Sequence, residues 1–260
     1  MGHIRLGELP KTLTWRQLLV VLGSDDATAH AVAVATARGA HARLRLLRDD
    51  SSLAYCFWLL TRLASAARHP DFGDALADLG LHAEATDSVL GFISQVGDRV
   101  RDEIGRHPES GPFGDLAADA LARALTETVG TEGRSLFGSS LDDLEHALQR
   151  HSTPDRFAVV AQRFFGDFLA RTLRFYVDKE LPQYVGYGGL DNVGDSAIFI
   201  DDLDRYTRES AVIVQQFAAD WFSKYDWRAA GAIDRDDAQR FVAVALGKLQ
   251  KELAQEEARR

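Results

Sequence analysis

Residues 153–181 carry the strongest structural signal in this sequence. Thr153 is a typical helix N-cap, and the fixed φ of Pro154 suits the first position of a helix. Apolar residues then recur at steps of three, four and seven, and charged residues occupy the opposite face. These apolar positions are Phe157, Val160, Phe164, Phe168 and Phe175. The pattern predicts one long amphipathic helix over residues 154–181, whose apolar face needs partner helices.

The positions of the prolines predict that the rest of the chain is helical too. All six lie where a helical repeat starts or stops, at Pro10, Pro70, Pro108, Pro112, Pro154 and Pro182. Hairpin turns of the Asn-Gly or Asp-Gly type and sustained period-two alternation are missing from the sequence. We therefore predict an all-α fold, a multi-helix bundle or orthogonal assembly. Its C-terminal part should pack three long helices antiparallel, over residues 154–181, 196–225 and 234–258.

Capping residues divide the remaining sequence into shorter helices. The predicted N-caps are Thr14, Ser24, Ser51 or Ser52, Asp71, Thr86 or Asp87, and Asp234. The helix predicted over residues 53–68 is apolar on nearly all sides and should be the buried centre of the N-terminal half. The segment 106–112 is the best linker candidate. We expect an N-terminal subdomain over 1–106, with an extended arm over 1–13, and a C-terminal bundle over 113–260. The two can form one continuous domain.

Composition restricts the classes of partner. The chain has 260 residues and a formal net charge of −9. Nucleic-acid binding without sequence preference and docking on an anionic membrane both need excess Lys and Arg, so the charge disfavours both. The single cysteine, Cys56, lies in an apolar run typical of a buried helix. The N-terminus has no apolar signal-peptide core, so we expect a cytoplasmic protein. Abundant Ala and Arg suggest a GC-rich bacterial genome.

Residues 197–205 resemble the Walker B segment of P-loop ATPases, in which an apolar run ends in acidic residues that hold Mg²⁺. The segment reads Ala-Ile-Phe-Ile-Asp-Asp-Leu-Asp-Arg. The resemblance implies nucleotide binding only beside a phosphate-binding loop, and the sequence contains no G-x-x-x-x-G-K-[ST]. We therefore interpret Asp201 with Arg205 and Asp204 with Arg208 as i, i+4 ion pairs on a solvated helix face.

Residues 226–237 have the frame of a calcium-binding EF-hand loop but lack part of its ligand set. Acidic residues take positions 1, 9 and 12, and a glycine takes position 6. Arg228 and Ala230 occupy positions 3 and 5, where oxygen ligands are required. We therefore expect a metal-free turn between two helices, with Asp234 as the N-cap of the second.

Motifs typical of enzymes are missing from the sequence. The eight histidines are scattered, none forms H-E-x-x-H, and no G-x-S-x-G nucleophile elbow is present. We expect no catalytic residues, no cofactor and no metal site. A catalytic triad assembled from distant residues is defined by geometry, however, and leaves no sequence motif.

Two surfaces are the candidate interaction sites. The N-terminal arm carries three apolar residues before the first helix, which can dock on a partner or pack on the chain's own core. The only local basic cluster lies near one helical face within residues 38–48, and it can receive an acidic partner or pair with nearby acids. The candidate residues are Ile4, Leu6, Leu9, Arg38, His41, Arg45 and Arg48.

These observations favour a non-enzymatic helical interaction or assembly protein. We predict a subunit or adaptor of a larger bacterial complex, with a protein partner or a second copy of the chain and without a membrane. One alternative is an enzyme with a dispersed site. Another is a sensor of nucleic acid or an anionic ligand that uses the 38–48 face, although the net charge makes nucleic acid the less favoured partner.

Overall fold

The fold consists of helices throughout the part of the chain that the computed structural model describes. The described residues are 9, 12–24, 28–83, 88–107, 111–132, 141–186, 192–228 and 233–255. Within them no strand is present, which confirms the predicted all-α fold. The α-helices are α1 (Leu13–Leu22), α2 (Ala29–Gly39), α3 (His41–Leu46), α4 (Ser51–Ala66), α5 (Phe72–Ala77), α6 (Val89–Ile104), α7 (Pro112–Glu127), α8 (Val129–Glu132), α9 (Leu141–Arg150), α10 (Pro154–Glu180), α11 (Val193–Glu209), α12 (Val212–Arg228) and α13 (Arg235–Gln255). Short 3-10 helices are η1 (Leu47–Asp49) and η4 (Leu181–Gln183).

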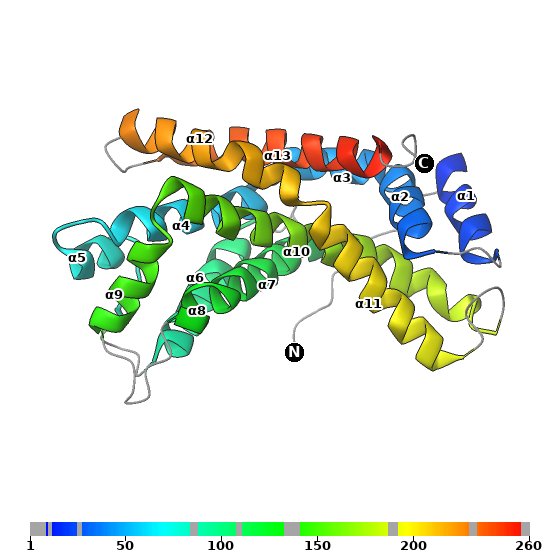
Figure 1. Ribbon diagram of the computed structural model, residues 1–260, viewed down its shortest axis with the longest axis horizontal. Helices are drawn as coiled ribbons and strands as arrows, with labels where there is room; N and C mark the ends of the chain where they lie inside the picture. The colour runs from blue at the N-terminus through cyan, green and yellow to red at the C-terminus, as the bar shows by residue number, and fades with distance from the viewer. Residues whose placement is uncertain are drawn as a thin grey trace.

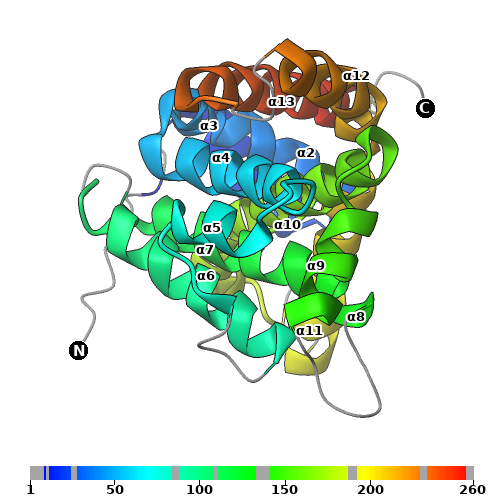
Figure 2. The same ribbon diagram turned by 90° about the vertical axis from the view of Figure 1, so that its left-hand side faces the viewer.

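The helices lie in layers, which Figures 1 and 2 show from two directions. In both views α12 and α13 form the upper layer. Beneath them pass α2, α4 and α10, and α6, α8 and the lower end of α11 lie further from that layer. In Figure 1, α1 and α2 are at one end of the molecule, and α5 and α9 are at the opposite end.

The long helices of the C-terminal part pack antiparallel, as predicted. Phe157 near the start of α10 stacks on Phe222 near the end of α12, with ring centroids 4.0 Å apart. Towards the other end of α10, Arg174 approaches Asp204 of α11 to 3.6 Å. Four residues further along α11, Arg208 lies 3.0 Å from Asp167, which is earlier in α10, so α11 and α12 both run opposite to α10. The last helix, α13, packs on α12 and also on α4 of the N-terminal half.

The helix predicted over residues 196–225 is bent. In the structure α11 ends at Glu209 and α12 begins at Val212. At the bend, the Ser210 hydroxyl donates to the carbonyl of Tyr206, 3.0 Å away. A side-chain bond of this kind competes with the backbone ladder and bends helices. The bend lets both segments follow the surface of α10.

Phe57 joins the two halves of the chain in one core. This residue of α4 is fully buried, and its ring stacks on Phe241 of α13 at a centroid distance of 4.6 Å. It also packs against Phe165 of α10 and Trp221 of α12. The buried side chains form a continuous cluster across residue 106. The division into two subdomains stays a prediction.

Several helix N-caps lie a few residues from their predicted positions. The residues that cap α1, α2, α4 and α6 are Thr12, Thr28, Asp50 and Ser88. Each has an extended backbone and accepts a hydrogen bond from the first turn of its helix. The predictions for Asp71 and Asp234 agree with the structure. Since neighbouring Ser, Thr and Asp residues have similar capping chemistry, only the backbone conformation decides which of them caps.

Candidate functional site

Asp167 is the centre of a charged network between α7, α10 and α11. Its side chain is 3% exposed, and three guanidinium groups surround it. Arg171, one turn further along α10, donates from Nε to Oδ2. Arg123 of α7 and Arg208 of α11 approach Oδ1 to 3.5 and 3.0 Å. A carboxylate this deeply buried needs such partners, because an unpaired buried charge is strongly destabilising.

The neighbouring Gly166 allows Arg208 to reach this carboxylate. A Cβ atom at Gly166 would lie 3.0 Å from the Cβ of Ala211 and 3.3 Å from the Cα of Arg208. A larger residue would therefore push the end of α11 away from α10. The close approach of the two helices places Arg208 within ion-pair distance of both Asp167 and Asp204.

Asp204 is the second buried carboxylate of the network. Its Oδ2 is 3.4 Å from Arg208 and 3.6 Å from Arg174, whereas its Oδ1 has no hydrogen-bond partner among the described residues. Burial raises the pKa of Asp204 above its usual value. The positive charges of Arg208 and Arg174 lower the pKa without cancelling this effect, and the negative charges of Asp167 and Asp178 raise it further.

This part of α11 differs from the solvated helix face that the sequence predicts. The i, i+4 pair of Asp204 and Arg208 is present, but Asp204 is buried against α10. Arg205 pairs with Asp202 at i−3, rather than with Asp201. The polar stripe of α11 faces the polar stripe of α10, and helical periodicity alone cannot distinguish such a contact from exposure to solvent.

Beside the network lies an open hollow of about 310 Å³, which we call the charged cleft. Four arginines and two aspartates are in its wall: Arg123, Arg171, Arg174, Arg208, Asp178 and Asp204. A neighbouring hollow of about 350 Å³, around Glu127 and Arg163, has equal numbers of arginines and acids in its wall. The excess of guanidinium groups makes the charged cleft the better candidate for an anionic ligand.

A second charged cluster lies where α6 meets the start of α13. The carboxylate of Glu103, which is buried, is 3.7 Å from Arg99, 2.8 Å from Arg106 and 2.7 Å from Arg235. We call these three arginines the arginine patch. Arg106 and Arg235 are 67% and 52% exposed, so both remain open to solvent while they bind Glu103.

Aromatic side chains of α4 fix the position of Arg235. Its guanidinium carbon lies 4.9 Å from the ring centroids of both Tyr55 and Trp58, within the range of cation–π attraction. The indole of Trp58 donates to the carbonyl of Ile233, 3.0 Å away, and so ties the start of α13 to α4. The arginine patch is therefore held by α4, α6 and α13 together.

The arginine patch keeps Glu103 ionised. Burial alone would raise the pKa of Glu103. The hydrogen bond from Arg235 and the charges of Arg235, Arg106 and Arg99 outweigh this effect and lower the pKa below its usual value. The carboxylate is thus a fixed negative centre that orients three guanidinium groups.

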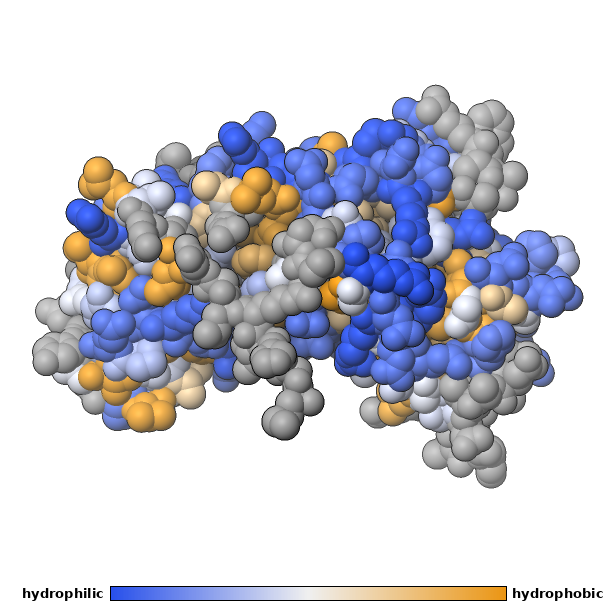
Figure 3. Space-filling model, turned by 180° about the vertical axis from the view of Figure 1, so that it is seen from behind, coloured by the Kyte–Doolittle hydropathy of each residue, from blue (hydrophilic) through white to orange (hydrophobic). Residues whose placement is uncertain are grey.

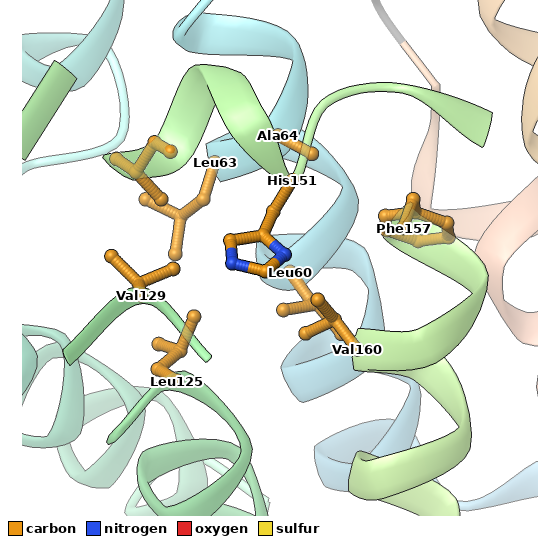
Figure 4. A pocket seen from close by; sticks show the side chains of 9 residues that line it. Leu60, Leu63, Ala64, Leu125, Val129, His151, Phe157 and Val160 are labelled. Atoms are coloured by element: carbon orange, nitrogen blue, oxygen red, sulfur yellow. The ribbon is translucent and has the colours of Figure 1, made fainter. Parts of the chain in front are cut away.

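A small cavity surrounds His151, as Figure 4 shows. Its volume is about 10 Å³, which is room for one water molecule and for no organic ligand. Its wall is apolar apart from the imidazole and is built from Leu60, Leu63, Ala64, Leu125, Val129, Leu148, Phe157 and Val160. We interpret it as a packing defect of the core rather than a binding site.

Exposed apolar side chains are spread over several helices of the described chain. They are Leu13, Val20, Leu46, Leu90, Val193, Ile198, Val212 and Val244. On the face that Figure 3 shows, apolar residues form separate patches between hydrophilic ones. Scattered residues of this kind are normal on a protein surface, so they define no apolar docking face by themselves.

The predicted interaction residues lie in different environments. Of the N-terminal arm, Leu9 is half-buried against the core, and Ile4 and Leu6 lie outside the described residues. Within the basic cluster, Arg38, His41 and Arg45 are exposed on α2 and α3. Arg48 of η1 is half-buried against α13, where its guanidinium donates to the Gln250 side chain and its backbone carbonyl accepts from the Gln239 side chain. The interaction role of these residues stays a prediction.

The turn between α12 and α13 lies partly outside the described residues, which exclude 229–232. At its end, Asp234 caps α13 by accepting from the amide of Asp237. Within the described ranges, His, Cys, Asp and Glu side chains form no group of three that could hold a metal ion. Cys56 is fully buried, and burial raises the pKa of its thiol.

Comparisons with protein-family models, curated proteins and solved structures find no match to this chain. Among the described helices, none combines the length and apolar character needed to cross a lipid bilayer. Function must therefore be argued from the arginine patch and the charged cleft themselves.

Sequence reasoning missed both charged sites. The weak signal for the charged cleft was the i, i+4 spacing of Asp167 with Arg171 and of Asp204 with Arg208, which recurs on two long helices. For the arginine patch, three basic residues at i−4, i+3 and i+4 from Glu103 were visible: Arg99, Arg106 and His107. Arg235 is 132 positions away from Glu103, and no local pattern indicates that contact.

Proposed function

We propose that this chain is a helical interaction protein without enzymatic activity, a subunit or adaptor of a larger bacterial complex. Its docking site is the arginine patch, and its partner offers an acidic protein segment. The observation that carries this proposal is the set of three guanidinium groups that Glu103 holds in fixed positions. A chain of net charge −9 concentrates three positive charges around one negative charge there.

The arginine patch is suited to carboxylates because its donors are oriented in advance. A guanidinium carries five N–H donors, and Glu103 engages only part of them on Arg106 and Arg235. Groups that are already ordered lose less entropy on binding than free side chains do. Arg and Trp are also enriched among residues that dominate binding energy at interfaces, and Trp58 lies directly beside Arg235.

The acidic net charge favours a short protein segment over a long polyanion. A nucleic acid would meet repulsion from the rest of the surface and would need many more basic contacts. An acidic segment of a few residues needs only the arginine patch. The N-terminal arm and the 38–48 face remain proposed additional contacts of the same assembly.

Charge reversal at one arginine tests this proposal. Arg106→Glu removes a guanidinium of the patch and leaves Glu103 bound by Arg99 and Arg235. Arg205→Glu is the matched control, because Arg205 is 68% exposed and forms the same kind of i, i+3 ion pair, with Asp202 on α11. Tagged full-length variants are expressed in the native host, and the retained proteins are quantified by mass spectrometry.

The expected result is a partner whose retention falls about tenfold for Arg106→Glu and is unchanged for Arg205→Glu, as for a disrupted charge contact at an interface. Peptide mapping should place the contact in an acidic segment of that partner. Equal retention by both variants would exclude the arginine patch as the docking site.

A further inference from the structure

We propose that the charged cleft binds a small organic oxyanion, a carboxylate or phosphate monoester with a short apolar body. The cleft lies between α7, α10 and α11, whereas the arginine patch is built on α4, α6 and α13. This inference therefore does not depend on the docking proposal.

Spare hydrogen-bond donors in the cleft wall are the first argument. Arg171 uses Nε for Asp167 and Nη1 for Asp119. Arg174 donates from Nε to Asp178, and its Nη1 forms a longer ion pair with Asp204 at 3.6 Å. The Nη2 group of each arginine thus keeps two N–H donors that have no partner among the described residues. Two guanidinium edges one helical turn apart on α10 suit the several acceptor oxygens of one carboxylate or phosphate.

The position of these arginines is fixed by the buried network beneath them. Asp167 forms ion pairs with Arg123, Arg171 and Arg208, and its own side chain is only 3% exposed. The wall of the cleft has four arginines and two aspartates. One of these aspartates, Asp204, has a raised pKa because of burial and so carries its negative charge less readily than an exposed carboxyl. Within the wall, guanidinium groups outnumber carboxylates, while Asp119, Glu127 and Asp167 pair with the same arginines from outside it.

The size and the apolar part of the wall restrict the ligand. A volume of about 310 Å³ is at the lower end of the range for small-molecule sites. Leu116 of α7 and Phe175 of α10 complete the wall, and both pack against the core without being fully buried. An oxyanion with a short apolar body can place its charged end on Arg171 and Arg174 and its body on these two side chains.

Isothermal titration calorimetry of the full chain with three probes tests this inference. Phenyl phosphate and benzoate combine an oxyanion with an apolar ring, and inorganic phosphate lacks the ring. The variant Arg174→Gln removes a guanidinium from the cleft and leaves Asp204 paired with Arg208. Arg205→Gln is the control, because Arg205 lies on α11 outside the cleft wall.

We expect phenyl phosphate or benzoate to bind at least about fivefold more tightly than inorganic phosphate, and the comparison of the two ringed probes identifies the preferred oxyanion. Arg174→Gln should weaken this binding about tenfold or more, and Arg205→Gln should leave it within about twofold, as for loss of one charge-assisted contact. A Leu116→Ala variant should weaken only the ringed probes.

Three results would overturn the inference. The first is the absence of binding by all three probes up to about 10 mM. The second is equal weakening of binding in Arg174→Gln and Arg205→Gln, which would indicate a general charge effect. The third is binding of inorganic phosphate that is as tight as, or tighter than, the binding of both ringed probes, which would exclude a role for the apolar wall.

Discussion

Asp167 is the most deeply buried carboxylate among the described residues. It forms ion pairs with three arginines, one on its own helix α10 and one each on α7 and α11. Asp167→Asn keeps the shape of the side chain but removes the negative charge. The three guanidinium groups then lose their common partner, although Glu127, Asp119 and Asp204 still bind one each. We expect the free energy of unfolding to fall by about 3 kcal/mol, as for a broken buried ion pair. Urea denaturation measures this change.

Asp178→Asn is the matched control for that substitution. Asp178 also pairs with an arginine of α10, but its side chain is 48% exposed. An exposed ion pair contributes little, so we expect a change below about 0.5 kcal/mol. A similar loss of stability in both variants would show that burial does not determine the role of Asp167.

Glu103 gives the stability a defined pH dependence. Its pKa is lowered in the folded chain by Arg235, Arg106 and Arg99, so the folded state binds a proton less readily than the unfolded state does. The resulting stabilisation is fully present above the unfolded pKa of about 4.3 and is lost as the pH falls through the lower folded value. Glu103→Gln should therefore destabilise the chain at pH 7 and flatten the decline of stability in acid.

The measurement is urea unfolding of the wild type and Glu103→Gln at a series of pH values from neutral to acidic. Asp204 contributes with the opposite sign, since its pKa is raised, and its contribution is common to both proteins. If the free energy of unfolding falls equally steeply with decreasing pH in both proteins, Glu103 is not a source of the pH dependence.

At the scale of helices, the contact between α1 and α2 depends on a glycine. A Cβ atom at Gly39 would lie 2.8 Å from Cε3 of Trp15 and 3.3 Å from its Cα. The indole cannot easily move aside, because it donates to Glu180 at 3.3 Å and packs on Tyr176. We expect Gly39→Ala to lower the free energy of unfolding by about 1–3 kcal/mol, as overpacking does.

Gly73→Ala is the control for this substitution. Gly73 is also in a helix, α5, and a Cβ atom there would meet nothing closer than 3.8 Å. Alanine has the higher helix propensity, so this variant should be more stable by up to about 1 kcal/mol. Thermal unfolding, monitored by circular dichroism, shows whether each variant is less stable or more stable than the wild type. Stabilisation in both variants would disprove the tight contact.

Much of the helix pattern could be predicted from local sequence, whereas helix partners could not. Pro154 after Thr153 and the apolar steps that follow gave the correct start of α10 and its length. The bend near Ser210 was missed because the apolar stripe continues through it. The buried charges of Asp167 and Asp204 were missed for a related reason: a polar stripe has the same periodicity whether it faces water or another polar stripe.

At the scale of the whole molecule, Phe57 of α4 packs against three helices of the C-terminal part, α10, α12 and α13. The sequence predicts α4 as a buried centre, but nothing local indicates that Phe165, Trp221 and Phe241 surround it. Phe57→Ala should lower the free energy of unfolding by about 3–5 kcal/mol. If one core serves both halves, residues before and after position 106 should lose protection from hydrogen exchange together in this variant.

The contrary result would be selective loss of protection in one half. In that case the two halves would unfold independently, and the predicted boundary near residue 106 would separate two cooperative units. Pulsed hydrogen exchange with mass spectrometry resolves the two halves directly.

Site-specific photo-crosslinking in the native host tests docking at the arginine patch most directly. A photoreactive phenylalanine analogue replaces Asp102 in one variant and Asp201 in the other, two exposed aspartates on α6 and α11, so that all three arginines of the patch are kept. Asp102 lies one helical turn before Arg106, and we predict a discrete crosslinked partner for position 102 alone, with the attachment in an acidic segment. Crosslinks of equal yield at both positions, or none at position 102, would contradict docking at the arginine patch.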